Sequence, residues 1–183
     1  MADLESQHLP QSLSCSVFIA RARSSALALA LLSGLVLSPA SVVADPGRPF
    51  IWPTSGRVTQ PFGCTTLDLE PFDPLCPSRH VHTGVDLASP GGTVVHSATS
   101  GVAHVGYDAA GAGLYVAVNF GAHVRLLYCH LFTAAIQSGQ AVEPGEVIGT
   151  VGSSGLATGP HLHFEIQVDG RSVDPGQWLT AGP

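Results

Sequence analysis

The clearest pattern in the chain is an alternation of polar and apolar residues in HLHFEIQV, residues 161–168. A β-strand has a side-chain period of two, so every second residue points to the same face. One face is apolar and suits a core: Leu162, Phe164, Ile166 and Val168. The other face is polar: His161, His163, Glu165 and Gln167. Two imidazoles and a carboxylate on one face indicate a metal site or a proton-transfer site rather than plain solvent-facing surface.

Short strand-like runs separated by Gly-rich turns fill most of the remaining chain. They predict strands at residues 56–60, 92–98, 101–108, 114–120, 123–131, 146–152 and 161–169. The single helical candidate is TAAIQSG, residues 133–139, which is about two turns long at most. We therefore expect a mainly β fold: a single antiparallel β-sheet domain with Gly-rich loops and little helix.

Composition narrows the range of partners. The 183 residues suffice for one domain with extensions, and 21 Gly and 14 Pro fit many turns between short strands. The formal net charge is -6, and the sequence contains no lysine. Because the chain offers no basic patch, we expect no nucleic-acid partner.

The N-terminal segment has the pattern of an export signal. An apolar run, residues 26–37, follows Arg21 and Arg23, and Val42 and Ala44 suit cleavage by a signal peptidase. We expect residues 1–44 to be removed as a signal peptide, and the protein to be extracellular, periplasmic or associated with the cell wall. The apolar run is short for a membrane span, so no stable membrane insertion is expected after cleavage, although an uncleaved anchor is the alternative.

Three cysteines follow the signal. Cys64 and Cys76 enclose CTTLDLEPFDPLC, and an exported protein would join them as a disulfide, which could contribute about 3 kcal/mol of stability. The alternative, a metal site built from thiols, lacks the short CxxC spacing. Cys129 points away from His130 in the strand reading, and we interpret it as a small buried residue with a free thiol.

A second pair of metal ligands is offered by HVHTGVDL, residues 80–87. His82 and Asp86 would stand roughly 13 Å apart in an extended strand, too far to share one ion. Gly84 lies between them and permits a bend. In HLH, by contrast, roughly 6.6 Å separates the alpha carbons of His161 and His163, so both rings can face one pocket. Spacing alone does not say which ring binds a metal and which moves protons.

A further histidine, His130, lies in LLYCHLF, where the period of two places it on the same face as Tyr128. Together the segments HTGVD, YCHL and TGPHLHFEI, in this order, resemble the HxxxD, YxHL and GxHxH elements of the lysostaphin and LytM type zinc metallopeptidases, peptidase family M23. The flanking segments WPTSGRVTQPFG and VDPGQWL are similar too. The resemblance covers residues 52–179, between a short linker at 45–51 and a tail at 180–183.

The resemblance implies a site with one zinc ion per chain. The family's zinc ligands correspond to His82, Asp86 and His163. Its catalytic histidines correspond to His130 and His161, which would activate the attacking water and stabilise or protonate the intermediate. These assignments rest on the family motifs alone, because spacing leaves the role of each histidine open.

Two further residues are candidates to orient the site, Glu165 and Tyr128. Glu165 lies on the polar face of its strand and is equally a solvated carboxylate. The chain departs from the family at Ala112, where an aromatic residue is common, and in its long Cys64–Cys76 loop. These departures affect the expected choice of substrate rather than the metal site.

The family implies an exported endopeptidase that hydrolyses peptide cross-links or bridges in bacterial peptidoglycan, and we expect it to act as a monomer. One alternative is a catalytically silent relative that binds the cell wall or activates a separate wall amidase. The complete ligand set argues against it. A second alternative, a zinc D-Ala-D-Ala carboxypeptidase, is expected to have a longer His-to-Asp spacing and an acidic residue at the first histidine of HxH.

Overall fold

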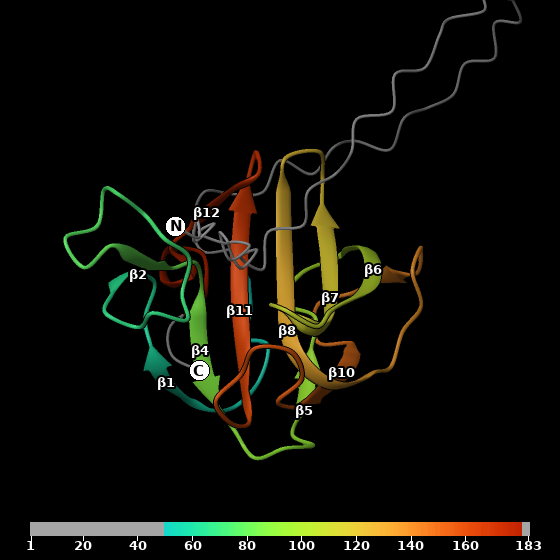
Figure 1. Ribbon diagram of the computed structural model, residues 1–183. Helices are drawn as coiled ribbons and strands as arrows, with labels where there is room; N and C mark the ends of the chain where they lie inside the picture. The colour runs from blue at the N-terminus through green and yellow to red at the C-terminus, as the bar shows by residue number, and fades with distance from the viewer. Residues whose placement is uncertain (1–49, 181–183) are drawn as a thin grey trace, which may run out of the picture.

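The computed structural model describes residues 50–180, and these form a protein built almost entirely of β-strands (Figure 1). The strands are β1 (Arg57–Gln60), β2 (Gly63–Thr65), β3 (His80–His82), β4 (Val85–Ala88), β5 (Val94–His96), β6 (Gly101–Asp108), β7 (Gly113–Phe120), β8 (Val124–Ala134), β9 (Ala141–Val142), β10 (Val147–Val151), β11 (His161–Val168) and β12 (Arg171–Val173). A 3-10 turn, η1 (Pro175–Gln177), is the one helical element of the described residues. The expected mainly β fold is confirmed.

Ten of the strands form one large sheet in the order β1-β4-β11-β8-β7-β6-β9. β12 pairs with β11, and β10 pairs with both β8 and β5. Every pair of named strands is antiparallel. β11 therefore lies between β4 and β8, in the middle of the view in Figure 1.

The two faces of β11 have the roles that its alternation predicts. Its apolar side chains enter the main core, where Phe164 is opposite Tyr128 and Ile166 is opposite Leu126 on β8. Leu162, Phe164 and Ile166 are fully buried, and burial of each such side chain contributes roughly 1.5–3 kcal/mol. The strand is thus held rigidly from its apolar side, and its polar side chains keep fixed directions.

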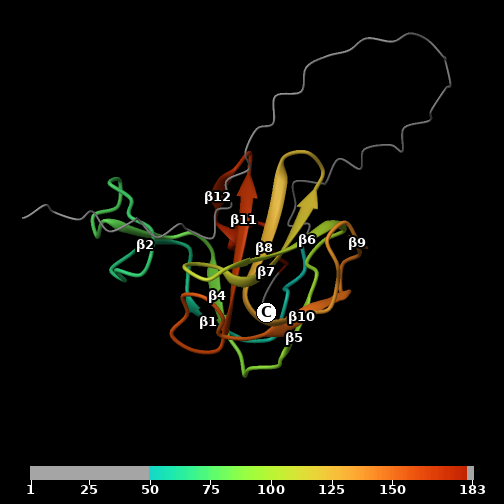
Figure 2. The same ribbon diagram turned by 45° about the vertical axis from the view of Figure 1, so that its right-hand side comes forward.

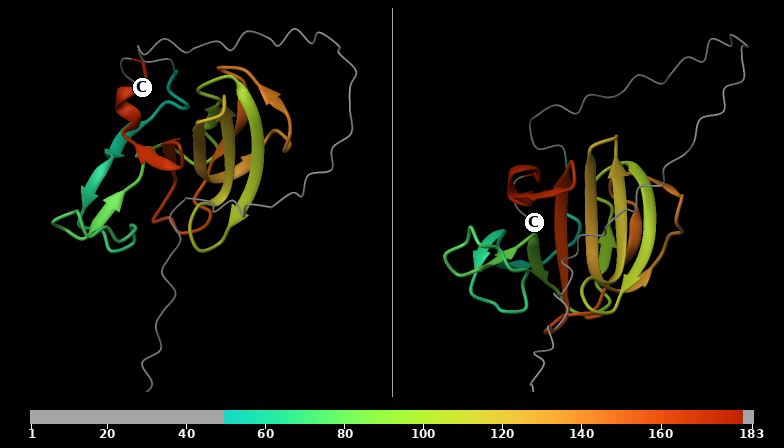
Figure 3. Two further views of the ribbon diagram at one scale, coloured as in Figure 1. Left: turned by 90° about the horizontal axis from the view of Figure 1, so that it is seen from above. Right: turned by 45° about the horizontal axis from the view of Figure 1, so that its top comes forward.

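The segment around β2 projects from the large sheet beside β4 (Figures 2 and 3). β2 pairs only with β3, in a separate two-stranded sheet. The expected disulfide between Cys64 and Cys76 is present, with a distance of 5.4 Å between the alpha carbons. Within the loop that it closes, the carbonyl of Pro71 accepts from the backbone N–H of Val81 at 3.0 Å. The disulfide and this hydrogen bond fix a long loop that has little core of its own.

Two expectations fail in the described residues. The segment 133–139 is not a helix, because β8 continues to Ala134 and pairs with β10, and the hydroxyls of Thr133 and Thr150 lie 2.7 Å apart across that pair.

Cys129 is fully buried as expected. No cysteine among residues 50–180 is free, however, so the expected free thiol is wrong.

The expected signal peptide and linker lie almost wholly outside the described residues, which begin at residue 50. Within residues 50–180, no helix is long and apolar enough to cross a membrane.

Candidate metal centre

Pairing between β4 and β11 places Asp86 directly opposite His163. His82 ends β3, and the chain then turns through Thr83 and Gly84 before β4 begins. A side chain at Gly84 would not fit, because an added Cβ would lie 2.3 Å from the carbonyl oxygen of Phe164. The bend expected at Gly84 is therefore present, and it brings His82 beside Asp86 although the two sequence segments are extended.

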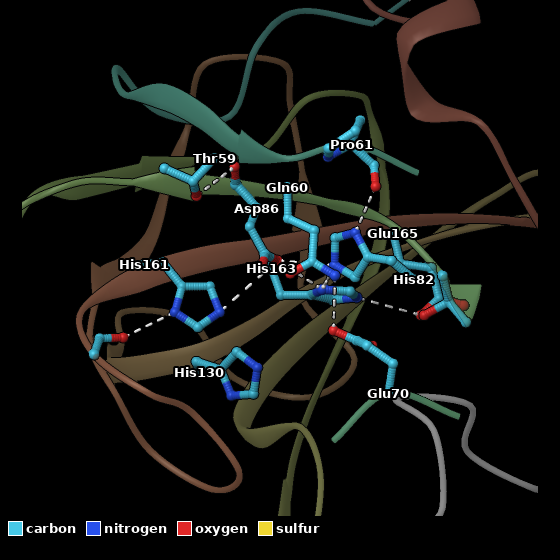
Figure 4. A network of polar contacts seen from close by, with 12 residues as sticks. Thr59, Gln60, Pro61, Glu70, His82, Asp86, His130, His161, His163 and Glu165 are labelled. Atoms are coloured by element: carbon cyan, nitrogen blue, oxygen red, sulfur yellow. Dashed lines mark hydrogen bonds and ion pairs between the residues drawn. The ribbon is translucent and has the colours of Figure 1, made fainter. Parts of the chain in front are cut away.

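Three potential ligand atoms converge at this point (Figure 4). Nε2 of His82 lies 3.1 Å from Oδ1 of Asp86 and 3.0 Å from Nδ1 of His163. Nδ1 of His163 lies 3.0 Å from the same oxygen of Asp86. Tetrahedral zinc with ligand bonds of about 2.0–2.1 Å requires its ligand atoms to be roughly 3.3 Å apart. The triangle formed by these atoms is close to that size, so the three residues fit a zinc ion.

The backbone fixes which nitrogen of His82 can bind a metal. Its Nδ1 lies 2.9 Å from the carbonyl oxygen of Pro61, which can only accept a hydrogen bond. Nδ1 therefore carries the proton, and Nε2 presents its lone pair to Asp86 and His163. His82 is fully buried, so the ring cannot turn away to solvent.

His163 has the opposite orientation. Its Nδ1 faces Asp86 and His82, while its Nε2 is buried without a hydrogen-bond partner and lies 3.7 Å from Oε2 of Glu165. A metal on Nδ1 would leave the proton on Nε2, directed towards the carboxylate of Glu165.

Glu165 is fully buried, so the solvated carboxylate is excluded in the folded chain. Its Oε1 accepts from Gln167 Nε2 at 2.7 Å and from Ser172 Oγ at 2.6 Å, and its Oε2 accepts from Thr83 Oγ1 at 3.0 Å. These donors come from three different segments of the chain. A buried charge is stable only with such partners, and here they hold the carboxylate beside His163.

The charges around the cluster favour a cation. Burial alone would raise the pKa of Asp86, but its contacts with His163 and His82 outweigh burial and hold the pKa below its usual range. Burial lowers the pKa of His163, whereas its contacts with Asp86 and Glu165 raise it to about 10. The pKa of His163 rises because two carboxylates flank its ring, and the same negative charge would attract a divalent metal ion.

Two more histidines border the cluster on the open side. His130 and His161 have ring centroids 4.8 Å apart, and Nε2 of His161 lies 3.8 Å from Oδ1 of Asp86. In each ring Nδ1 is 2.8 Å from a backbone carbonyl oxygen, of Ser154 for His130 and of Gly159 for His161. Both rings therefore have Nε2 free to accept a proton. Burial lowers the pKa of His130 to about 4, so this ring is neutral at pH 7.

The period of two predicted the wrong face of β8 for the side chain of His130. The residue has a positive φ of 60°, and its N–H donates to the carbonyl of Ala112 at 2.8 Å. This irregularity turns its side chain away from the core face of Tyr128 and towards His161.

Tyr128 consequently has no place in the metal cluster. It is fully buried in the main core, and its hydroxyl accepts from the backbone N–H of Ala98 at 2.8 Å. The suggestion that Tyr128 orients the site is therefore wrong.

A pocket opens next to the cluster, and sequence reasoning missed part of its wall. It is lined by Asp86, His130, His161 and His163 on one side and by residues of the Cys64–Cys76 loop on the other, Leu67, Leu69, Glu70 and Pro71. Gln60 also lines the pocket, and its amide donates to Glu70 (Figure 4). The length of the loop is visible in the sequence, but no periodicity indicates which of its residues point inwards.

The four remaining histidines of the described residues do not join the cluster, as expected. His80 Nδ1 donates to the carbonyl of Glu70 at 2.7 Å, and His96 Nδ1 to that of Gly145 at 2.8 Å. His123 pairs with Asp169 at the surface, and His104 is exposed on β6. Among residues 50–180, the group of donors close enough to hold a metal is His82, Asp86 and His163.

Comparison with known proteins identifies similar chains. DD-carboxypeptidase/endopeptidase Mpg of Neisseria meningitidis is 39% identical over 119 residues, which are 65% of this chain and 26% of that protein. Peptidoglycan DD-endopeptidase ShyA of Vibrio cholerae is 40% identical over 93 residues, 51% of this chain and 22% of that protein. The chain thus matches about a quarter of the length of these curated relatives.

A crystal structure of a zinc containing peptidase from Vibrio cholerae has a similar fold. Its TM-score is 0.60 at 30% identity, and the match covers 75% of this chain and 41% of that one.

The model of Peptidase family M23 matches residues 80–175, just over half of the chain. The matched range begins at β3, ends in η1, and contains His82, Asp86, His130, His161 and His163. The chain belongs to peptidase family M23.

Proposed function

We propose that this protein is an exported zinc metalloendopeptidase that hydrolyses peptide bonds in bacterial peptidoglycan. His82, Asp86 and His163 are the zinc ligands, one ion is bound per chain, and the catalytic domain comprises residues 52–179. The observation that carries the proposal is the triangle of donor atoms with edges of 3.0–3.1 Å, bordered by two histidines whose Nε2 atoms are free.

Two imidazoles and one carboxylate are the ligand set of a catalytic rather than a structural zinc site, because they leave a coordination position open. When bound, zinc would supply a Lewis acid that polarises the scissile carbonyl and lowers the pKa of water. Glu165 fixes the orientation of the His163 ring through its contact with Nε2. A structural site would have no use for His130 and His161 on its open side.

The two flanking histidines divide the proton transfers. A neutral ring with Nδ1–H donated to a carbonyl oxygen can accept a proton at Nε2 from the attacking water and return it to the leaving nitrogen. His130 and His161 both have this arrangement. Protonated at Nε2, either ring can also stabilise the negative charge that develops on the carbonyl oxygen.

The substrate class comes from the relatives. ShyA is named a peptidoglycan DD-endopeptidase, and Mpg a DD-carboxypeptidase/endopeptidase. A peptidoglycan substrate requires export, which agrees with the signal-like sequence of residues 1–44.

The decisive experiment is mass spectrometry of fragments released from purified peptidoglycan by the zinc-loaded protein, with a chelated sample as control. New amino and carboxyl termini that disappear on chelation would establish a metal-dependent endopeptidase and identify the bond. A folded, zinc-occupied protein that released nothing from several wall types would instead support the silent relative that binds the wall or activates an amidase.

A further inference from the structure

One carboxylate in the pocket has no assigned role. Glu70 lies in the loop closed by Cys64 and Cys76 and lines the pocket opposite the histidines. Figure 4 shows its side chain directed towards Gln60 and the metal cluster, and its Oε1 accepts from Gln60 Nε2 at 3.1 Å. It is not itself within the group of metal-binding donors.

The backbone around Glu70 is fixed. Its carbonyl accepts from His80 Nδ1 at 2.7 Å, and its N–H donates to the carbonyl of Leu67 at 3.1 Å. The disulfide closes the loop at both ends. The carboxylate is therefore presented to the pocket from a constrained backbone, which reduces the entropy lost when a ligand binds it.

Among residues 50–180, no lysine or arginine lines the pocket beside this carboxylate. The whole chain has no lysine, and the arginines within residues 50–180 lie outside the pocket lining. The other lining carboxylate, Asp86, contacts two histidines, whereas Glu70 forms no ion pair in the structure of residues 50–180. Glu70 therefore places a negative charge on the wall opposite His130 and His161, and its carboxylate accepts a hydrogen bond only from the neutral amide of Gln60.

A negative wall discriminates between substrates by charge. A substrate ammonium group near Glu70 would gain a charge-assisted hydrogen bond, and a substrate carboxylate there would be repelled. In the described part of the chain, the pocket lining also offers no arginine or lysine with which to hold the free carboxylate of a chain terminus.

From this geometry we propose that Glu70 is a specificity-determining residue that selects peptides with a free primary amino group close to the scissile bond and rejects peptides with a free carboxylate there. The amino group can come from the side chain of a diamino acid or from a peptide amino terminus. This inference rests on the proposed function, because it concerns the substrate of the same site.

The test uses matched synthetic peptides that differ only near the scissile bond: a free side-chain amine, a free terminal amine, each of these acetylated, and a free carboxylate. kcat/KM is measured for the zinc-loaded wild-type protein and Glu70→Gln. The equilibrium Kd is measured by isothermal titration calorimetry with the metal-free form of each protein, which does not consume the peptides. Asp68→Asn is the matched control, because Asp68 lies in the same loop with a 96% exposed side chain and does not line the pocket.

We expect the wild-type protein and Asp68→Asn to prefer one of the free amines over its acetylated form by about tenfold in kcat/KM and in Kd. Glu70→Gln should reduce that preference to about twofold or less and improve binding of the carboxylate peptide. The two amine peptides identify the source of the amino group. Added salt should weaken the preference in the wild-type protein.

Preference that persists in Glu70→Gln, or equal treatment of all peptides by the wild-type protein, would overturn the role of Glu70. Failure to cleave any peptide would instead count against the proposed function, and the Kd ratios would then still decide the role of Glu70. A thermal melt of Glu70→Gln checks that the loop and sheet remain folded.

Discussion

Replacing Glu165 with glutamine tests whether the buried carboxylate supports the metal site. Oε1 could keep its two bonds, from Gln167 and Ser172. Oε2 would become an amide NH2 facing Thr83, whose hydroxyl can rotate to accept. The same NH2 would also face the N–H at Nε2 of His163, across the present distance of 3.7 Å. In the variant, two hydrogen-bond donors would therefore face each other.

The expected loss is therefore concentrated on the metal. Removal of a partner that orients a metal-binding histidine typically reduces affinity about 10- to 100-fold, or roughly 1.4–2.8 kcal/mol. The fold should lose less, about 1–2 kcal/mol, because most hydrogen bonds to Glu165 persist.

The assay is competition for zinc against a chromophoric chelator, with urea unfolding of the metal-free proteins alongside. Glu143→Gln is the matched control, since Glu143 is exposed and distant in sequence from the ligands. If Glu165→Gln were folded and bound zinc within twofold of the wild-type protein, the reasoning about this network would be refuted.

Other changes separate the remaining roles. His163→Ala should lose most bound zinc, and full zinc occupancy by elemental analysis would disprove its assignment as a ligand. His161→Ala and His130→Asn should keep zinc and lose at least about 100-fold in kcat. Asparagine replaces His130 because it tolerates the positive φ at residue 130. Near-normal turnover in either variant would reassign the proton carrier. Reduction of the Cys64–Cys76 disulfide should destabilise the fold by about 3 kcal/mol, measured by urea unfolding, and an unchanged midpoint would show that the loop adds no stability. The pKa of His130 is about 4 in the folded chain and 6.5 in the unfolded chain, so the unfolded chain takes up the proton first as pH falls. The free energy of unfolding of the metal-free wild-type protein should therefore fall by about 2 kcal/mol between pH 7 and pH 5, relative to His130→Asn. Parallel pH profiles of stability for the two proteins would contradict this.

Much of the fold follows from local pattern. The alternation in β11 predicted both the core side and the site side, because the strand has one apolar and one chemically active face. The bend at Gly84 followed from a distance argument, and the structure adds the close approach of Phe164 as its reason.

The failures have a common physical origin in contacts between distant segments. The side chain of His130 depends on a positive φ that accompanies a hydrogen bond to Ala112. Glu165 is buried because Thr83 and Ser172 reach it from other segments. Residues 133–139 lost their expected helix to pairing with β10. A period of two or of 3.6 contains none of this information.

The donors of the metal centre belong to different sheets. His82 ends a strand of the small two-stranded sheet, whereas Asp86 and His163 lie on paired strands of the large one. An ion held by all three would therefore act as a cross-link between the two sheets, next to the loop that carries Glu70. Backbone amides of β2 and β3 would then exchange with solvent more slowly in the loaded protein, so that metal supply would set the rigidity of the pocket wall as well as the chemistry.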